Sequence, residues 1–370
     1  MEVKIQESHV VNIHEIIRAL YFVSEDIQHV EHAGDKLTID LKRDANYEHI
    51  QKNIQFILKT FVQQGDIVIN QFTNSIPYSQ EHKPAAHRYV SGRVIFNSDA
   101  VKLFNFFDSA FKDIALELNA QERIYPTLLP ISVLKKTNYL KTSPQYSMFV
   151  CYSKEDFDVL NQLNESVNKG DVLESCNEPQ FSLSPAACFH TYEEYENKTL
   201  PRNQVLTFTQ NVFRNEGRKS WEETGRLRDY KVREIVFIGD SQFVFECKSF
   251  LTQKTIEFVK KIGLRGYLCT SHDSFIIPNM QKYKKFQWME NTKQEIKLES
   301  GIEKQIAVAS FNFHSQGFTH PFNIKINNID DPVSGCVGFG LERWVISFLH
   351  QFGHNPDLWP AFVSQSIIRQ

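Results

Sequence analysis

Residues 208–240, FTQNVFRNEGRKSWEETGRLRDYKVREIVFIGD, constrain the fold of this chain more than any other stretch. Two apolar runs rich in β-branched and aromatic residues flank a long polar loop, a pattern that predicts two strands of a hairpin and not a helix. Arg214 lies at one foot of the loop and Arg226 at the other. Guanidinium groups are permanently charged forks that bind phosphate, although a solvated hairpin with surface charges has the same pattern. The stretch therefore predicts a β-rich domain with a candidate phosphate site.

A second stretch, residues 335–344 (GCVGFGLERW), runs from small residues of a predicted strand into a predicted helix that begins with Glu-Arg. In this order, FRNE with its loop and GFGLER resemble the second and third signature motifs of class II aminoacyl-tRNA synthetases. A predicted helix at residues 99–118, capped by Asn97 or Ser98 and followed by Pro126, is similar to the first motif, which forms the dimer interface in that family. The resemblance implies an α+β fold, with an antiparallel β-sheet flanked by helices, and a homodimer.

Three shorter segments resemble a narrower family, the amino acid:[carrier protein] ligases: PAAC at residues 185–188, SFNFH at 310–314, and GCVGFGLERW. These ligases are similar to the atypical, zinc-containing seryl-tRNA synthetases and lack a tRNA-binding domain. The resemblance implies ATP-dependent activation of a small amino acid as its adenylate, followed by transfer to the phosphopantetheine thiol of a carrier protein. Two alternatives stay open: a seryl-type aminoacyl-tRNA synthetase, and a non-catalytic paralogue that binds a nucleotide or a partner.

The family pattern implies an ATP site. Arg214 would hold the α-phosphate, Arg226 would meet the β- and γ-phosphates, and Arg343 would approach the γ-phosphate from the opposite side. Tyr230 stands where an aromatic ring stacks on adenine, and Mg²⁺ would neutralise the triphosphate. A surface salt bridge is the alternative for each arginine. The substrate carboxylate is already ionised at pH 7, so catalysis would rest on alignment and charge stabilisation.

The narrower family also implies a Zn²⁺ site, which on this chain would consist of Cys188, Glu216 and Cys336. Thiolate and carboxylate groups suit zinc, and three protein ligands leave a fourth position for water or for the α-amino group of the substrate. The cysteines show no CxxC spacing, and a buried apolar role is the alternative for each free cysteine.

Two residues are expected in the substrate pocket. Asn312 is a polar residue on a predicted central strand, where a satisfied buried amide is the alternative to a pocket residue. The family carries an acidic residue in a KxELE-like strand before the SFN segment, and the run KKFQWME (residues 284–290) puts Gln287 in that place. Glutamine offers no carboxylate, which favours the non-catalytic alternative. Glu290 is an alternative, but strand alternation turns it to the other face.

Residues 1–85 are expected to form a small α/β module of unknown role, and residues 86–370 the catalytic domain, with the boundary in the polar link around Pro84. Helical apolar spacing is predicted near residues 13–23 and 47–62, and strands near 27–42 and 67–72. We find no chemistry in this module. It lacks the sustained heptads of the long coiled coil that grips tRNA in ordinary seryl-tRNA synthetases.

Composition limits the partners and the cellular compartment that can be expected. The chain of 370 residues has a net charge of −3, from 41 basic and 44 acidic residues, which argues against a tRNA partner. No apolar run reaches the roughly 18 residues that would span a membrane, and the start lacks a signal-peptide core. The six cysteines show no disulfide-framework spacing. We therefore expect a cytoplasmic protein without a membrane partner.

Overall fold

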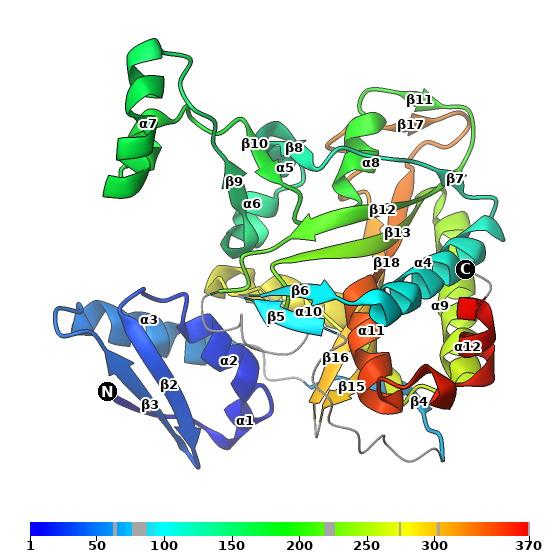
Figure 1. The fold of residues 1–370 in the computed structure, drawn as a ribbon, viewed down its shortest axis with the longest axis horizontal. Helices are drawn as coiled ribbons and strands as arrows, with labels where there is room; N and C mark the ends of the chain where they lie inside the picture. Colours follow the sequence, from blue (N-terminus) through cyan, green and yellow to red (C-terminus); the bar gives the residue numbers. More distant parts are fainter. Residues whose placement is uncertain are drawn as a thin grey trace.

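The chain folds around one large β-sheet (Figure 1). The computed structural model describes residues 1–61, 65–75, 87–90, 92–217, 226–273, 275–301 and 304–368. Within these residues the predicted α+β class is confirmed, since the sheet is antiparallel except for one short pair of strands and is flanked by helices. The predicted boundary at Pro84 and the loop residues 218–225 lie outside the described residues.

The N-terminal module has a core of its own. Its helices carry apolar residues three and four positions apart, and its strands carry alternating apolar residues. The apolar faces of the helices and of the strands pack together into one cluster. Its strands pair in the order β1-β3-β2. The elements are β1 (Glu2–Lys4), α1 (Glu7–Val10), α2 (Ile13–Leu20), β2 (Ile27–Ala33), β3 (Lys36–Leu41) and α3 (Tyr47–Thr60). The helices and the hairpin predicted for this region are confirmed.

The large sheet has eight strands in the described part of the chain. In spatial order they are β4 (Val68–Phe72), β14 (Gly266–Thr270), β15 (Lys293–Gly301), β16 (Lys304–Ser315), β18 (Val333–Gly340), β13 (Asp229–Gly239), β12 (Gln204–Phe213) and β7 (Gln121–Glu122). β12 and β13 form the predicted hairpin. β4 pairs with β14, so the strand expected in the module at residues 67–72 extends the large sheet instead.

Helices cover one face of the sheet: α4 (Ser98–Leu116), α9 (Ser241–Ile262), α11 (Leu341–Phe352) and α12 (Ala361–Ile368) (Figure 1). Stacked aromatic rings, such as those of Phe111 and Phe339 at 4.0 Å between centroids, fill this layer. The Asn97 side chain caps α4 by accepting a hydrogen bond from the Ala100 amide. This matches the helix predicted for the first motif.

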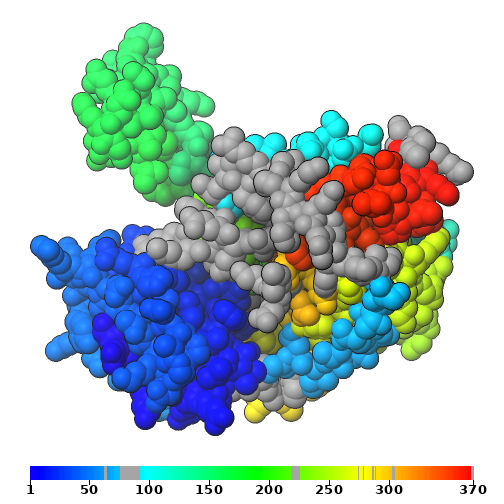
Figure 2. Space-filling view, turned by 60° about the horizontal axis from the view of Figure 1, so that its bottom comes forward, coloured from blue at the N-terminus to red at the C-terminus, as the bar shows by residue number. Residues whose placement is uncertain are grey.

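The remaining elements are shorter, and several of them pack against a second apolar cluster on the opposite face. They include the hairpin β5 (His87–Val90) and β6 (Arg93–Phe96), the strands β8 (Leu128–Pro130), β9 (Met148–Val150), β10 (Phe181–Leu183), β11 (Thr199–Leu200) and β17 (Lys325–Ile326), and the helices α5 (Ile131–Lys136), α6 (Tyr139–Thr142), α7 (Phe157–Lys169), α8 (Phe189–Glu194) and α10 (Gln281–Met289). Single 3₁₀ turns lie at Pro144–Tyr146, Val172–Ser175, Pro278–Met280 and Pro356–Leu358. In Figure 2 the arm with α7 (green) stands apart from the body. Among the described helices, none is both long enough and apolar enough to cross a bilayer.

Candidate active site

A cluster of metal-binding side chains lies on the face of the sheet opposite the long helices. Cys188, at the start of α8, His314, on β16, and Cys336, on β18, have their donor atoms within 4.8 Å of one another. His314 Nε2 is 3.3 Å from Cys336 Sγ. Burial lowers the pKa of His314 to about 4, so its imidazole is neutral and has a free lone pair. The structure thus brings together the two predicted cysteines and adds a histidine.

Glu234 of β13 borders the same cluster. Because Val236 pairs with Cys336 across the β13–β18 ladder, Glu234 shares the sheet face of this cysteine, two residues away. Burial, and then the Cys336 thiol beside it, raise the pKa of the Glu234 carboxyl well above its ordinary value. A carboxylate buried beside thiols is costly without a cation, and thiolate, imidazole and carboxylate are all zinc ligands. These donors therefore fit a zinc ion.

Glu216, the predicted carboxylate ligand, lies elsewhere in the described structure. Its carboxylate is 3.6 Å from the Arg226 guanidinium, and it lines a small pocket with Tyr146 and residues of the N-terminal module. The sequence reasoning placed it in the metal site because it follows Arg214 in FRNE, and it missed Glu234 and His314. His314 was visible in SFNFH, whereas the position of Glu234 follows from the register of β13 and β18.

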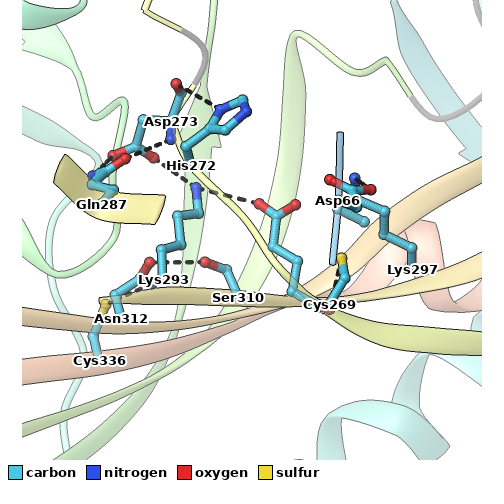
Figure 3. Close-up of polar contacts among 12 residues, drawn as sticks. Asp66, Cys269, His272, Asp273, Gln287, Lys293, Lys297, Ser310, Asn312 and Cys336 are labelled. Atoms are coloured by element: carbon cyan, nitrogen blue, oxygen red, sulfur yellow. Dashed lines mark hydrogen bonds and ion pairs between the residues drawn. The ribbon is translucent and has the colours of Figure 1, made fainter. Parts of the chain in front are cut away.

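Next to the donor cluster, polar side chains form a row across three strands. Lys293 on β15 pairs with Asn312 on β16, which pairs with Cys336 on β18. Figure 3 shows these three side chains on one face of the sheet. Asn312 Nδ2 is 3.5 Å from Cys336 Sγ, and Asn312 Oδ1 accepts a hydrogen bond from Ser310 Oγ at 3.0 Å. Asn312 thus lies between the donor cluster and the lysine.

The structure corrects the position of Gln287. The run KKFQWME lies within α10 and the turn that follows, so Gln287 is not on a strand. The strand that precedes SFN is β15, whose run KQEIKLE (residues 293–299) carries Lys293 and Glu295. Lys293 Nζ is 2.6 Å from Asp273 and 3.3 Å from Glu295. The strand before SFN therefore carries a carboxylate, that of Glu295, at the place where a glutamine was predicted.

Two of the three predicted arginines lie near Tyr230. The Arg343 guanidinium stands 5.4 Å from the centre of the Tyr230 ring, and its Nη1 donates a hydrogen bond to the Ala307 carbonyl. Arg214 Nε donates to the Pro185 carbonyl at 2.9 Å. Burial alone would lower the pKa of Arg214, but the charges of Tyr230 and neighbouring groups raise it. Fixed cations beside an aromatic ring suit a nucleotide.

Comparisons with known proteins agree with this geometry. No protein-family model matches the chain. The type-2 serine–tRNA ligase of Methanococcus maripaludis (strain C5) is 26% identical over 301 residues, which cover 75% of this chain and 56% of that protein. The corresponding ligase of Methanococcus aeolicus is 23% identical over 376 residues and covers 95% of this chain and 68% of its own length. The chain thus spans little more than half of the first of these relatives.

Solved structures give the same fold. The seryl-tRNA synthetase of M. kandleri, solved in complex with A. aeolicus tRNASec, has a TM-score of 0.68 at 18% identity, covering 94% of this chain and 75% of that one. The seryl-tRNA synthetase of Pyrococcus horikoshii complexed with ATP has a TM-score of 0.60 at 11% identity, covering 86% of this chain and 77% of that one.

The prediction that tRNA is not a partner, which rested on net charge and on the missing heptads, is wrong. The curated relatives are named as tRNA ligases, and a protein of the same fold is solved with a tRNA bound. A net charge of −3 sums over the whole chain and does not describe any one surface. The chain is a homologue of the catalytic domain of class II aminoacyl-tRNA synthetases, with type-2 serine–tRNA ligases among its relatives.

Proposed function

We propose that this chain activates an amino acid with ATP and transfers it to the 3′ end of a tRNA, as a seryl-type ligase. One observation carries the proposal: the metal-binding cluster, the polar row and the Arg214–Tyr230–Arg343 group lie next to one another around the neighbouring strands β15, β16, β18 and β13. An amino acid has three groups that a site can recognise. Its amine suits the metal-binding cluster, its side chain suits the polar row, and its carboxylate, joined to ATP, suits the arginine group.

The first step joins the amino acid to ATP. A carboxylate oxygen attacks the α-phosphorus, the bond to the bridging oxygen breaks, and pyrophosphate leaves with its electron pair. Arg214 would hold the α-phosphate and Arg343 the γ-phosphate, where fixed positive charges stabilise the charge that develops. Arg226 would meet the β- and γ-phosphates, and Tyr230 would stack on adenine. Mg²⁺, when bound, would neutralise the triphosphate.

We propose Cys188, Cys336 and a carboxylate or imidazole from Glu234 and His314 as the residues that hold zinc. A bound zinc ion would supply a Lewis-acid position that accepts a neutral α-amine. Asn312, and the Lys293–Glu295 pair beside it, would then face the substrate side chain and fix its orientation. Gln287 would act on the pocket through Asp273 and not as a direct ligand.

The segment after α4 supports the proposed homodimer. Ile124 is 98% exposed, two residues before Pro126, in the stretch that links α4 and β7 to the rest of the domain. The first motif, which this part of the chain resembles, forms the dimer interface in its family, so the Ile124 side chain would lie where the proposed dimer covers it. Because the two protomers of a two-fold dimer present the same surface to each other, the surface around Ile124 would meet the same surface of the partner.

Amino-acid-dependent exchange between ATP and labelled pyrophosphate, across the twenty amino acids, tests the proposal. We expect exchange with serine or another small amino acid, and exchange at least about 100-fold slower with the Arg214→Gln variant. Adding tRNA to the activated enzyme should then give aminoacyl-tRNA. A phosphopantetheinylated carrier protein serves as the second acceptor, because the ligase-like segments around Cys188 and Asn312 favour a thiol. If only the thiol is aminoacylated, the acceptor is the carrier protein and not tRNA. If no amino acid supports exchange, the proposal is refuted.

A further inference from the structure

The segment that links β14 to β15, residues 271–292, contacts both the N-terminal module and the polar row; we call it the bridging segment. On the module side, Ile276 packs against the module core, and the turn at Pro278–Met280 lies against α3. On the other side, the Ser271 amide donates to the Lys293 carbonyl at 3.0 Å. Figure 1 shows α10, the helix of this segment, beside the module.

An ion pair between Lys284 and Glu15 connects α10 to the N-terminal module. Lys284 Nζ of α10 lies 2.5 Å from Glu15 Oε2 of α2, and Nζ is 4.6 Å from the centre of the Phe61 ring. The Lys284 side chain is 1% exposed and that of Glu15 is 25% exposed. Burial would raise the pKa of Glu15, but Lys284 and His272 hold it lowered, at about 2, so the carboxylate is charged at neutral pH. A buried ammonium that loses its partner is strongly unfavourable.

The next turn of the helix reaches the substrate pocket. Gln287 is three residues after Lys284, on the same side of α10. Its amide holds Asp273 twice: Oε1 accepts from the Asp273 amide at 2.8 Å, and Nε2 donates to the Asp273 carboxylate at 2.8 Å. The same carboxylate accepts from Lys293 Nζ at 2.6 Å. Figure 3 shows Gln287, Asp273 and Lys293 in this order, ending beside Asn312.

From this continuous set of contacts we propose that Glu15 and Lys284 are positioning residues, through which the N-terminal module sets the affinity of the pocket for its amino acid. The inference rests on the proposed function, because it assigns the polar row to that substrate. The module fixes Lys284, Lys284 fixes α10, and α10 fixes Asp273 and thereby Lys293. Arg214 and Arg343, which would bind ATP, make none of these contacts, whereas Arg226 lines a small pocket together with Glu15. A partner that displaced the module would therefore change amino-acid affinity more than ATP affinity.

Glu15→Gln, Lys284→Met and the double variant form the test in the full-length chain. In the exchange assay we expect Glu15→Gln to raise the KM for the amino acid at least about 5-fold, the lower end of typical coupling between sites, and to change the KM for ATP by less. The double variant should recover part of this loss, because neither side then holds an unpaired charge. Lys285→Met, on an exposed neighbour in α10, is the matched control and should behave as wild type.

Amide hydrogen exchange separates this inference from the proposed function, since it needs no activity. We expect faster exchange in residues 271–292 of Glu15→Gln, with protection of the module core retained. Faster exchange confined to residues 1–61 would mean that the ion pair stabilises only the module, and would overturn the inference. Equal rises in the KM values for amino acid and ATP would overturn it as well. If the wild type activates no amino acid, the proposed function fails, while hydrogen exchange still decides whether the module positions the bridging segment.

Discussion

Replacing Lys293 by methionine tests whether the polar row is held by charge. The Lys293 ammonium is 2.6 Å from Asp273 and 3.3 Å from Glu295, and its side chain is 12% exposed. At an effective dielectric constant of about 20, these distances correspond to attractions of about 6 and 5 kcal/mol, before several kcal/mol of desolvation are subtracted. Removing one partner of a buried pair costs about 3–5 kcal/mol.

The lower end of that range applies here. The Asp273 side chain is 48% exposed, so it regains water when the lysine is lost, whereas Glu295 is 14% exposed and stays buried without a counter-charge. We expect Lys293→Met to lower the free energy of unfolding by about 3 kcal/mol. For a domain of this size, with an unfolding entropy of about 0.6 kcal/mol/K, this lowers Tm by about 5 °C.

The dependence on pH gives a second, independent readout. Burial raises the pKa of Glu295, but Lys293 and Lys297 lower it by more, so its folded pKa lies below the unfolded value. Its stabilising effect is therefore complete above the unfolded pKa of about 4.3 and is lost as the pH falls through the folded value. The difference between wild type and Lys293→Met should be largest near neutral pH and should shrink below about pH 4.

Thermal and urea unfolding, followed by circular dichroism, measure both effects, with Lys325→Met, at an exposed position of β17, as the control. The control should cost less than about 0.5 kcal/mol. A loss of stability in Lys293→Met no larger than in the control, or one independent of pH, would refute the reasoning that charge holds this row together.

Three further predictions concern metal, catalysis and assembly. Cys188→Ser or Cys336→Ser should lose bound zinc in metal analysis while Cys247→Ser, buried on the helix face, keeps it; full zinc content in all three would contradict the metal site. Arg214→Gln should slow pyrophosphate exchange at least about 100-fold with the fold retained by circular dichroism, because one fixed positive charge at the α-phosphate is lost; a smaller effect would move that role to another residue. Ile124→Asp should shift the protein from dimer to monomer in sedimentation velocity, and an unchanged mass would remove this surface from the interface.

The sequence predicts the framework of the catalytic domain because its signals are local. The strands on both sides of Arg214, the strand-to-helix passage before Arg343 and the cap at Asn97 each follow from a few neighbouring residues, and the structure confirms all three. Cys188 and Cys336 are also brought together as the resemblance implied.

What the sequence does not reveal is register. Glu234 lies near Cys336 because Val236 of β13 lies opposite Cys336 of β18, and no local pattern states this register, whereas Glu216 lies in the loop after β12. Gln287 failed for another reason. Its run alternates briefly, with Phe286 and Trp288 on either side of Gln287, just as residues 293–299 alternate with the buried Ile296 and Leu298, so a period this short does not tell the helix from the strand.

The glycines of the third motif show how a sequence signature follows from the site. A Cβ atom at Gly338 would stand 2.8 Å from Glu234 Oε2, and one at Gly335 would stand 2.3 Å from the Phe237 ring and 2.7 Å from the Asn312 carbonyl. Neither glycine has the positive φ that would make it necessary for backbone reasons. Both positions hold glycine because neighbouring groups approach β18 closely on both of its faces: Glu234 at Gly338, and Phe237 at Gly335. A larger side chain at 338 would push the Glu234 carboxylate away from Cys336, and one at 335 would press on the opposite, helix-covered face instead.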